Sequence, residues 1–143
     1  MRIRKRSRIM EDIVVQKILL VDDAGILLRT VKGMLDEFYD VKVVISGRLA
    51  VNSIKIDRPD LVILDYGMPS MDGESTFDAI RALDNGRDIP IIYLTGADDK
   101  ITIMKLMKKK PAGYILKPPE KEKLLKTVRD VLEKAEKEKG NGE

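Results

Sequence analysis

Five short apolar runs, unbroken or nearly so, limit most strongly what this chain can fold into. The runs cover residues 18–21, 41–45, 61–64, 91–94 and 114–116. Unbroken runs of this length are typical of strands that are buried on both faces, as in a parallel sheet. In a chain of 143 residues they predict one α/β domain and leave no room for a second ordinary domain.

The segments between the runs predict helices that cover the sheet. Three of them place their apolar residues on one helical face, namely Leu27, Leu28, Val31, Leu35 and Phe38, then Phe77, Ile80 and Leu83, and last Leu124, Leu125, Val128, Val131, Leu132 and Ala135. Residues 101–110 are the least regular segment, because their apolar side chains do not form a single stripe. We therefore expect five βα units, joined by right-handed crossovers that make the sheet parallel.

The residue types that are missing restrict the chemistry. The chain has no Cys and no His, which excludes disulfides, thiolate or imidazole catalysis and an ordinary zinc site. Any nucleophile or base must therefore be a carboxylate, a hydroxyl or a lysine. No run approaches the about 18 apolar residues of a membrane span, and no signal-peptide pattern is present, so we expect a cytoplasmic protein without membrane contact.

A basic arm begins the chain. Five positive charges fall within the first eight residues, at Arg2, Arg4, Lys5, Arg6 and Arg8. Subtracting these five charges from the net charge of +3 leaves −2 for the rest. Because no aromatic residue lies among them to stack on a base, we expect no specific nucleic-acid binding. We divide the chain into an arm of residues 1–16, flexible at least in part, a domain of residues 17–138 and a tail of residues 139–143.

Polar side chains follow four of the five runs. Asp22 and Asp23 follow the first run, Asp65 the third, Thr95 the fourth and Lys117 the fifth. The carboxyl ends of parallel strands share one edge, so these side chains should converge there. Two carboxylates about 4 Å apart repel by about 1 kcal/mol in water and about 4 kcal/mol near a protein surface, so the cluster needs a positive partner. Lys117 and a hard cation such as Mg2+ are the candidates, and the set suits phosphoryl transfer onto a carboxylate.

Four motifs stand in order at these strand ends. They read Ile18-Leu-Leu-Val-Asp-Asp23, then Asp60-Leu-Val-Ile-Leu-Asp65 with Met68-Pro69 and Met71-Asp72-Gly73, then Thr95-Gly96, and last Lys117-Pro118. With them, residues 17–138 resemble the receiver domains of two-component response regulators, the CheY-like domains. The resemblance implies a flavodoxin-like, doubly wound, five-stranded parallel sheet of order 2-1-3-4-5 with helices on both faces.

The resemblance also implies a phosphoacceptor. Asp65 would receive a phosphoryl group from the phosphohistidine of a histidine kinase or phosphotransfer protein. Asp23 would bind Mg2+ directly and Asp22 mainly through water, while Asp65 and the backbone carbonyl of Gly67 would complete the protein ligands. Such a protein signals, and the only reactions it catalyses are its own phosphorylation and dephosphorylation.

Three further residues would respond to the phosphoryl group. By resemblance, Lys117 would contact it, Thr95 would hydrogen-bond it and Tyr114 would follow by changing rotamer. Two simpler interpretations stay open, because Thr95 could cap the next helix and Tyr114 could be a core residue, as aromatics in apolar strands often are. The family pattern implies a cis bond before Pro118. Gly96 replaces the family's usual Ala but leaves space for the phosphoryl group.

The expected partners are a phosphodonor protein and a downstream protein, which would bind the fourth helix, fifth strand and fifth helix. Because only about five residues follow the last predicted helix, we expect a stand-alone receiver that signals by protein contact or phosphorelay. A receiver excised from a hybrid kinase and a receiver-like scaffold that is never phosphorylated are the alternatives. An aspartyl-phosphate phosphatase would need a carboxylate where Gly67 stands, and a flavin carrier would need a phosphate loop where Asp22 and Asp23 repel phosphate. Lys105, Lys108, Lys109 and Lys110 are interpreted as a solvated helix face.

Overall fold

Five strands and five α-helices alternate along the chain in the computed structural model, which describes residues 15–68 and 72–141. The strands are β1 (Lys17–Val21), β2 (Asp40–Val44), β3 (Leu61–Asp65), β4 (Ile91–Thr95) and β5 (Gly113–Leu116). The helices are α1 (Gly25–Leu35), α2 (Gly47–Ile56), α3 (Gly73–Arg81), α4 (Lys100–Met107) and α5 (Lys121–Asn141), with a short 3-10 helix η2 (Asp84–Gly86) before β4. Nearly all of the expected arm lies outside the described residues.

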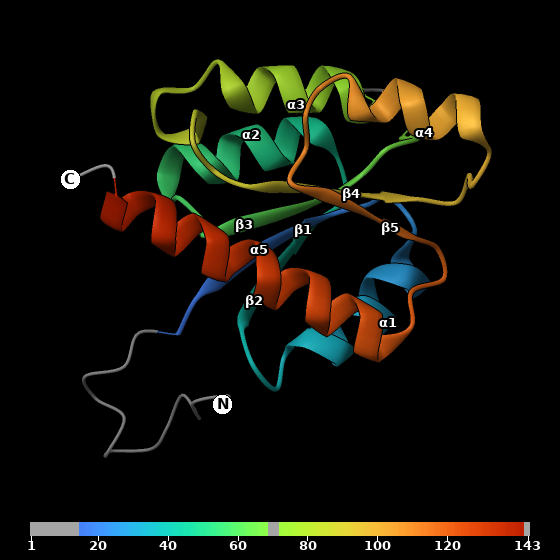
Figure 1. Cartoon of the computed structure of the whole chain (residues 1–143), viewed down its shortest axis with the longest axis horizontal. Coiled ribbons are helices and arrows are strands. Elements are labelled where there is room, and N and C mark those ends of the chain that lie inside the picture. The colour runs from blue at the N-terminus through green and yellow to red at the C-terminus, as the bar shows by residue number, and fades with distance from the viewer. Residues whose placement is uncertain (1–14, 69–71, 142–143) are drawn as a thin grey trace.

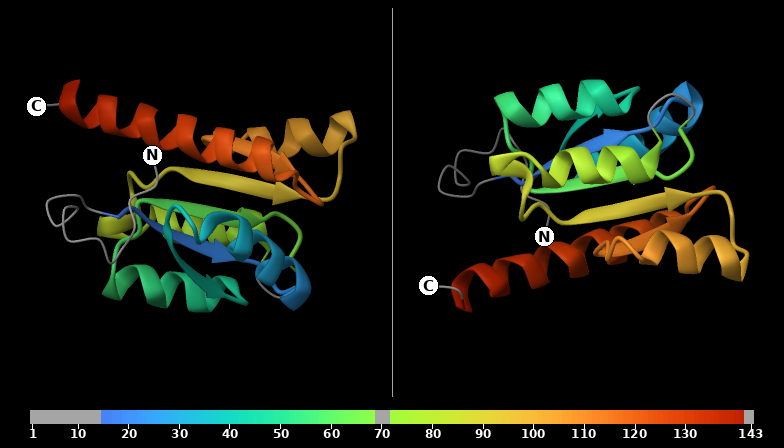
Figure 2. Two further views of the ribbon diagram at one scale, coloured as in Figure 1. Left: turned by 90° about the horizontal axis from the view of Figure 1, so that it is seen from below. Right: turned by 90° about the horizontal axis from the view of Figure 1, so that it is seen from above.

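The strands form one parallel sheet in the order β2-β1-β3-β4-β5, which confirms the predicted topology. Helices α1 and α5 cover one face of this sheet, and α2, α3 and α4 cover the other (Figures 1 and 2). No helix in the described part of the chain is long and apolar enough to cross a membrane.

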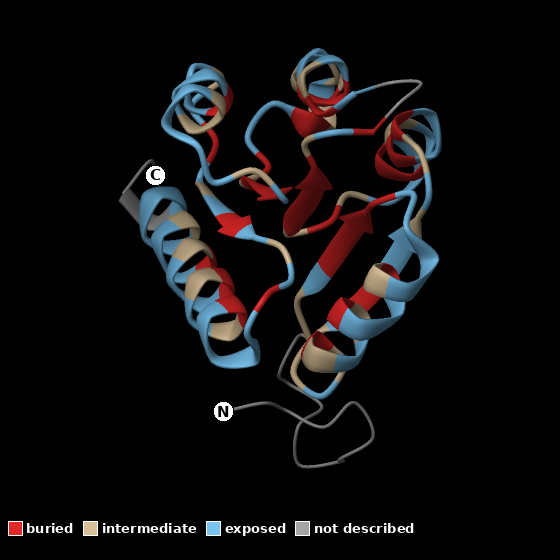
Figure 3. Cartoon of the chain, turned by 90° about the vertical axis from the view of Figure 1, so that its right-hand side faces the viewer, coloured by how far each residue is buried: buried red, intermediate tan, exposed pale blue. Residues whose placement is uncertain are grey.

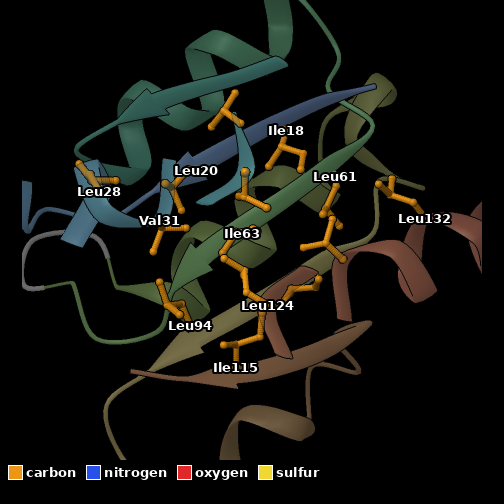
Figure 4. Close-up of a cluster of buried hydrophobic side chains, with 14 residues drawn as sticks. Ile18, Leu20, Leu28, Val31, Leu61, Ile63, Leu94, Ile115, Leu124 and Leu132 are labelled. Carbon is orange, nitrogen blue, oxygen red and sulfur yellow. The ribbon is translucent and has the colours of Figure 1, made fainter. Parts of the chain in front are cut away.

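The three central strands, β1, β3 and β4, are apolar along nearly their whole length because they supply both faces of the sheet, whereas the edge strands β2 and β5 each bury one residue. In β1, Ile18 and Leu20 pack under α1 and α5, whereas Leu19 and Val21 pack under α2 and α3. Figure 4 shows the first of these two clusters, where Leu124 of α5 lies among strand residues such as Ile63. In Figure 3 the strands are mainly buried, while the outer faces of the helices are exposed.

Three element boundaries differ from the predictions. Helix α1 ends at Leu35, so Phe38 lies in the turn after the helix, with its amide bonded to the Leu35 carbonyl. Helix α3 ends at Arg81, so Leu83 lies beyond the end of the helix, where it still packs against the core. Helix α5 continues to Asn141, so residues 139–141 belong to a helix and not to a separate tail.

Candidate functional site

The sheet brings the predicted site residues to one edge. Asp22 follows β1, Asp65 is the last residue of β3 and Thr95 the last of β4. Lys117 follows β5, and its amide donates to the Thr95 carbonyl at 2.8 Å. Backbone bonds of neighbouring strands therefore fix the spacing of these residues before any side chain interacts.

Three carboxylates gather at this edge. Asp22, Asp23 and Asp65 each place an oxygen within 4.8 Å of the others. Asp22 is fully buried and Asp65 is 5% exposed, whereas Asp23 is exposed to solvent. The cluster is thus open on the side of Asp23 and closed on the other two sides.

The ammonium of Lys117 lies between the two buried acids. Its Nζ is 2.9 Å from Asp22 Oδ2 and 2.9 Å from Asp65 Oδ1. Asp65 Oδ1 also accepts the Gly67 amide at 3.2 Å, and Asp22 Oδ1 accepts the Ala24 amide at 2.9 Å. Asp22 Oδ2 thus has the Lys117 ammonium as its ion-pair partner. Three carboxylates therefore gather around a single ammonium.

The pKa values of Asp65 and Lys117 are both raised in this site, for different reasons. Burial raises the pKa of Asp65, and the nearby Asp22 charge adds to this effect, although the hydrogen bonds from Lys117 and Gly67 oppose it. Burial alone would lower the pKa of Lys117, but its contacts with Asp65 and Asp22 outweigh that effect and raise the pKa. Lys117 thus stays charged at neutral pH, and the site holds an excess of negative charge.

Thr95 does not cap the helix that follows it. The cap of α4 is Asp99, whose Oδ1 accepts the Thr102 amide at 2.8 Å. The Thr95 hydroxyl instead accepts the Ala97 amide at 3.1 Å and is itself buried at the site edge. The hydroxyl is held by this local turn and not by a helix end.

Tyr114 is not a core residue. It lies on β5 opposite Tyr93 of β4 and is 40% exposed. Leu116 of the same strand is 42% exposed. Only Ile115 of this strand is buried. The core interpretation of Tyr114 is therefore wrong.

Gly73 and Tyr93 both contact the loop that follows Asp65 and help to fix its position. The sequence alone did not predict this role for either residue. A Cβ on Gly73 would lie 2.6 Å from Tyr66 Cα and 2.8 Å from the Asp65 carbonyl oxygen. The Gly73 amide donates to the Tyr66 carbonyl at 3.0 Å, and the Tyr93 hydroxyl donates to the Gly73 carbonyl at 3.2 Å. The Met-Asp-Gly motif was the available signal for this close approach. Pro69 and Met71 of the same motifs lie outside the described residues.

The lysine cluster of α4 is not simply a solvated face. Lys109 Nζ lies 2.8 Å from Asp78 Oδ2, and Lys105 Nζ lies 3.8 Å from Glu74 Oε1. Both acids belong to α3, so two ion pairs connect the helices. Lys108 and Lys110 are exposed.

The Lys117–Pro118 bond is cis, as the resemblance implies.

Comparisons with known proteins agree with this geometry. The family model of the response regulator receiver domain matches residues 18–129. The regulatory protein LuxO of Vibrio vulnificus strain YJ016 is 33% identical over 104 residues, which are 73% of this chain but only 22% of LuxO. The chain thus spans about a fifth of that curated relative.

Solved structures show the same fold. The chemotaxis protein CheY4 of Vibrio cholerae has a TM-score of 0.77 and 30% identity, over 82% of this chain and 99% of CheY4. The receiver domain of the sensor histidine kinase PA1611 of Pseudomonas aeruginosa PAO1 has a TM-score of 0.77 and 31% identity, over 83% of this chain and 98% of that domain. PA1611 was crystallised with a magnesium ion coordinated in its active site cleft. Together with the sheet order and the matched residues, these findings place this chain in the family of response regulator receiver domains.

Proposed function

We propose that this receiver accepts a phosphoryl group on Asp65. The observation that supports this most is the position of Asp65, which is the only carboxylate of the cluster that both ends a central strand and bonds to Lys117 and to a loop amide. A carboxylate oxygen would attack the phosphorus of a phosphohistidine, forming a P–O bond as the P–N bond breaks. The imidazole leaves with the bonding pair and takes up a proton.

The donor set fits Mg2+, which prefers oxygen ligands and retains waters. Asp23 is exposed at the mouth of the site and is the proposed direct ligand, with Asp65 and the Gly67 carbonyl. Asp22 is buried against Lys117 and suits the water-mediated role. When bound, the ion would offset the carboxylates and the charge of the incoming phosphoryl group. The presence of three carboxylates beside one ammonium supports this need for added positive charge.

Lys117 and Thr95 are the proposed contacts of the phosphoryl group. Lys117 already lies 2.9 Å from Asp65, so its ammonium has little distance to move to reach a phosphoryl oxygen there. Thr95 would exchange its local bond with Ala97 for one to the phosphoryl group. Because Tyr114 is on the neighbouring strand and half exposed, it is the proposed side chain that follows.

The proposed phosphodonor is a histidine kinase or a phosphotransfer protein. The proposed surface for a downstream protein comprises α4, β5 and α5, where Ile101, Met104, Tyr114 and Leu116 are exposed. Exposed apolar side chains grouped on one face are typical of protein-binding surfaces. The stand-alone arrangement, the cytoplasmic location and the limit of catalysis to the protein's own phosphorylation stay predictions.

Intact-mass measurement after treatment with acetyl phosphate and Mg2+ tests the phosphoacceptor. The wild-type chain should gain one phosphoryl group, and Asp65→Asn should gain none. Asp60→Asn is the matched control, because it removes one carboxylate at the opposite edge of the sheet and should remain reactive. Equal modification of Asp65→Asn and wild type would show that Asp65 is not the acceptor.

The metal requirement needs a separate measurement. Adding EDTA, or replacing Asp23 with Asn, should abolish the mass gain, since the ion must balance the acidic cluster. Amide NMR spectra recorded during a Mg2+ titration should show shifts at Asp23 and Gly67 in the wild type and not in Asp23→Asn. A spectrum that does not respond to Mg2+ would favour the scaffold alternative.

A further inference from the structure

A groove lies at the edge of the sheet opposite the phosphorylation site. It has a volume of about 610 Å³ and runs between the C-terminal half of α5 and the loops before β3 and β4. Its floor is apolar and includes Leu132 and Pro90. Figures 1 and 2 show that the C-terminal end of α5 and the start of β1 lie at the same end of the molecule.

The rim of the groove is mainly acidic. Four carboxylates line it, at Asp60, Asp88, Glu136 and Glu138, against the two cations Arg58 and Lys139. Asp88, Glu136 and Glu138 are exposed and form no ion pair with any of the residues that the structure describes. The nine lining residues therefore carry an excess of two negative charges.

The basic arm enters the fold beside this groove. Asp60 of the rim accepts the Lys17 amide at 2.7 Å through Oδ2, and its own amide donates to the Lys17 carbonyl at 2.8 Å. Lys17 is the first residue of β1, so the segment that carries the five cations of residues 1–8 is tethered next to the acidic rim.

The length of the arm is sufficient for it to reach the whole groove. Eight residues lie between Arg8 and Lys17, which makes nine steps from Cα to Cα, and an extended chain spans up to about 3.3 Å per step, or about 30 Å in all. The α5 segment from Leu132 to Lys139 covers only about 10 Å at a helical rise of about 1.5 Å per residue. Ile9 and Ile13 of the arm also match the apolar floor in chemical character.

We propose that the N-terminal arm docks in this groove of its own domain, with its arginines against the rim carboxylates and its apolar residues on the floor. The arm is then an internal ligand, and any polyanion must compete with Asp88, Glu136 and Glu138 for it. Exposed ion pairs are individually weak and screened by salt, so the docking should weaken as ionic strength rises.

Paramagnetic broadening in NMR tests the docking. The chain has no Cys, so Ser7→Cys gives one site for a nitroxide label within the basic cluster. At low salt the label should broaden the amides of Asp88, Ile89 and residues 132–139 most strongly. A random chain of ten residues would already hold the label at about 18 Å from Lys17, so the informative quantity is the change between variants.

The groove variant is Asp88→Asn with Glu136→Gln, and the control is Glu37→Gln with Glu122→Gln, which removes two exposed charges elsewhere. The groove variant and 0.5 M NaCl should each reduce the broadening at the groove by at least about twofold, and the control should not. The groove variant should also bind heparin at least about threefold more tightly than the wild type, because the cations of the arm would no longer be paired with the groove.

Broadening that is unchanged in the groove variant would overturn the proposal. So would broadening of a 15N-labelled, nitroxide-free chain when it is mixed with an unlabelled, nitroxide-bearing one, because the arm would then bind a second copy. The same amide spectra report whether each variant is folded, so a folding defect cannot be mistaken for loss of docking.

Discussion

Helices α3 and α4 lie on the same face of the sheet and are held there in different ways. Helix α3 buries Gly73, Thr76, Phe77 and Ile80, and its first residue packs directly on the loop after Asp65. Helix α4 buries only Leu106, and two ion pairs join it and the turn after it to α3, one from Lys105 of the helix and one from Lys109 of the turn. Buried apolar area stabilises far more than exposed ion pairs, so α3 is part of the rigid frame and α4 is loosely attached.

The same contrast divides the strands. All five residues of β3 are buried, whereas β5 buries only Ile115. The site therefore has a fixed side, formed by β1, β3 and α3. The other side, next to Thr95, is formed by α4 and β5, each of which buries a single residue. A signal that starts at Asp65 would move the second side at lower cost in free energy.

The largest effect should come from the core of α3. Phe77→Ala should lower the free energy of unfolding by about 3–5 kcal/mol, because the ring stacks on Tyr93 and is 3% exposed. Met104→Ala on α4, where the side chain is 58% exposed, should change it by less than about 0.5 kcal/mol. Urea unfolding of the two variants measures the difference, and similar losses would mean that α4 is packed as tightly as α3.

Removing the ammonium should have the next largest effect. Lys117→Ala leaves two buried carboxylates without their cation and should cost about 2 kcal/mol at pH 7, less than for a fully buried pair because Lys117 is partly exposed. The pKa of Asp65 is raised in the folded state, so folding binds protons and stability falls as pH rises above about 4 through that folded pKa. Without Lys117 this fall should be steeper.

The cost of Lys117→Ala should therefore shrink as the pH is lowered through the raised pKa of Asp65, because this carboxyl then takes up its proton and no longer needs the cation. Urea unfolding at several pH values measures this trend. A cost that is constant across this range would show that the ammonium does not control the ionisation of the cluster.

Gly73→Ala should cost about 1–2 kcal/mol, because the new methyl group would meet backbone atoms of Asp65 and Tyr66 that cannot move aside cheaply. Gly96→Ala is the matched control on the other side of the site, since a Cβ there meets nothing within 4 Å. It should be neutral within about 0.5 kcal/mol. Thermal unfolding compares the pair, and equal melting temperatures would remove the close approach from the explanation.

The smallest effect concerns the ion pairs. Lys109→Gln should speed amide hydrogen exchange in α4 and leave α3 unchanged, because it removes the shorter of the two links. Lys108→Gln is the control, since that exposed lysine makes no ion pair among the described residues. Faster exchange in both helices would mean that they open as one unit.

The strands were the elements that the sequence predicted well. All five runs were placed to within one residue, and in β1, β3 and β4 the reason is that a strand between two helix layers must be apolar. Helix α4 had no clear stripe, and the structure explains this, since only Leu106 is buried and Ile103 packs partly buried against the core. The spacing of Glu74 with Asp78 and of Lys105 with Lys109 was a usable signal for the ion pairs, but the sequence did not show which of these side chains would meet.

The candidate site was predictable for a different reason. Its charged residues follow strand ends, and a parallel sheet brings strand ends together whatever the details of packing. What the sequence does not contain is the state of each side chain: that Asp22 is fully buried while Asp23 is exposed, or that the ring of Tyr114 lies outside the core. These properties depend on contacts between residues that are distant in the chain.

The division between a fixed and a responsive side is tested most directly by amide NMR spectra recorded with Mg2+ and beryllofluoride, a mimic of the phosphoryl group. The shifts at Thr95, Ala97, Tyr114 and Leu116 should clearly exceed those at Thr76, Phe77 and Ile80. In Thr95→Ala the mimic should still bind and shift Gly67, but the response at Tyr114 should be much smaller. Equal shifts in α3 and in the α4–β5 region, or a full Tyr114 response in Thr95→Ala, would contradict this division.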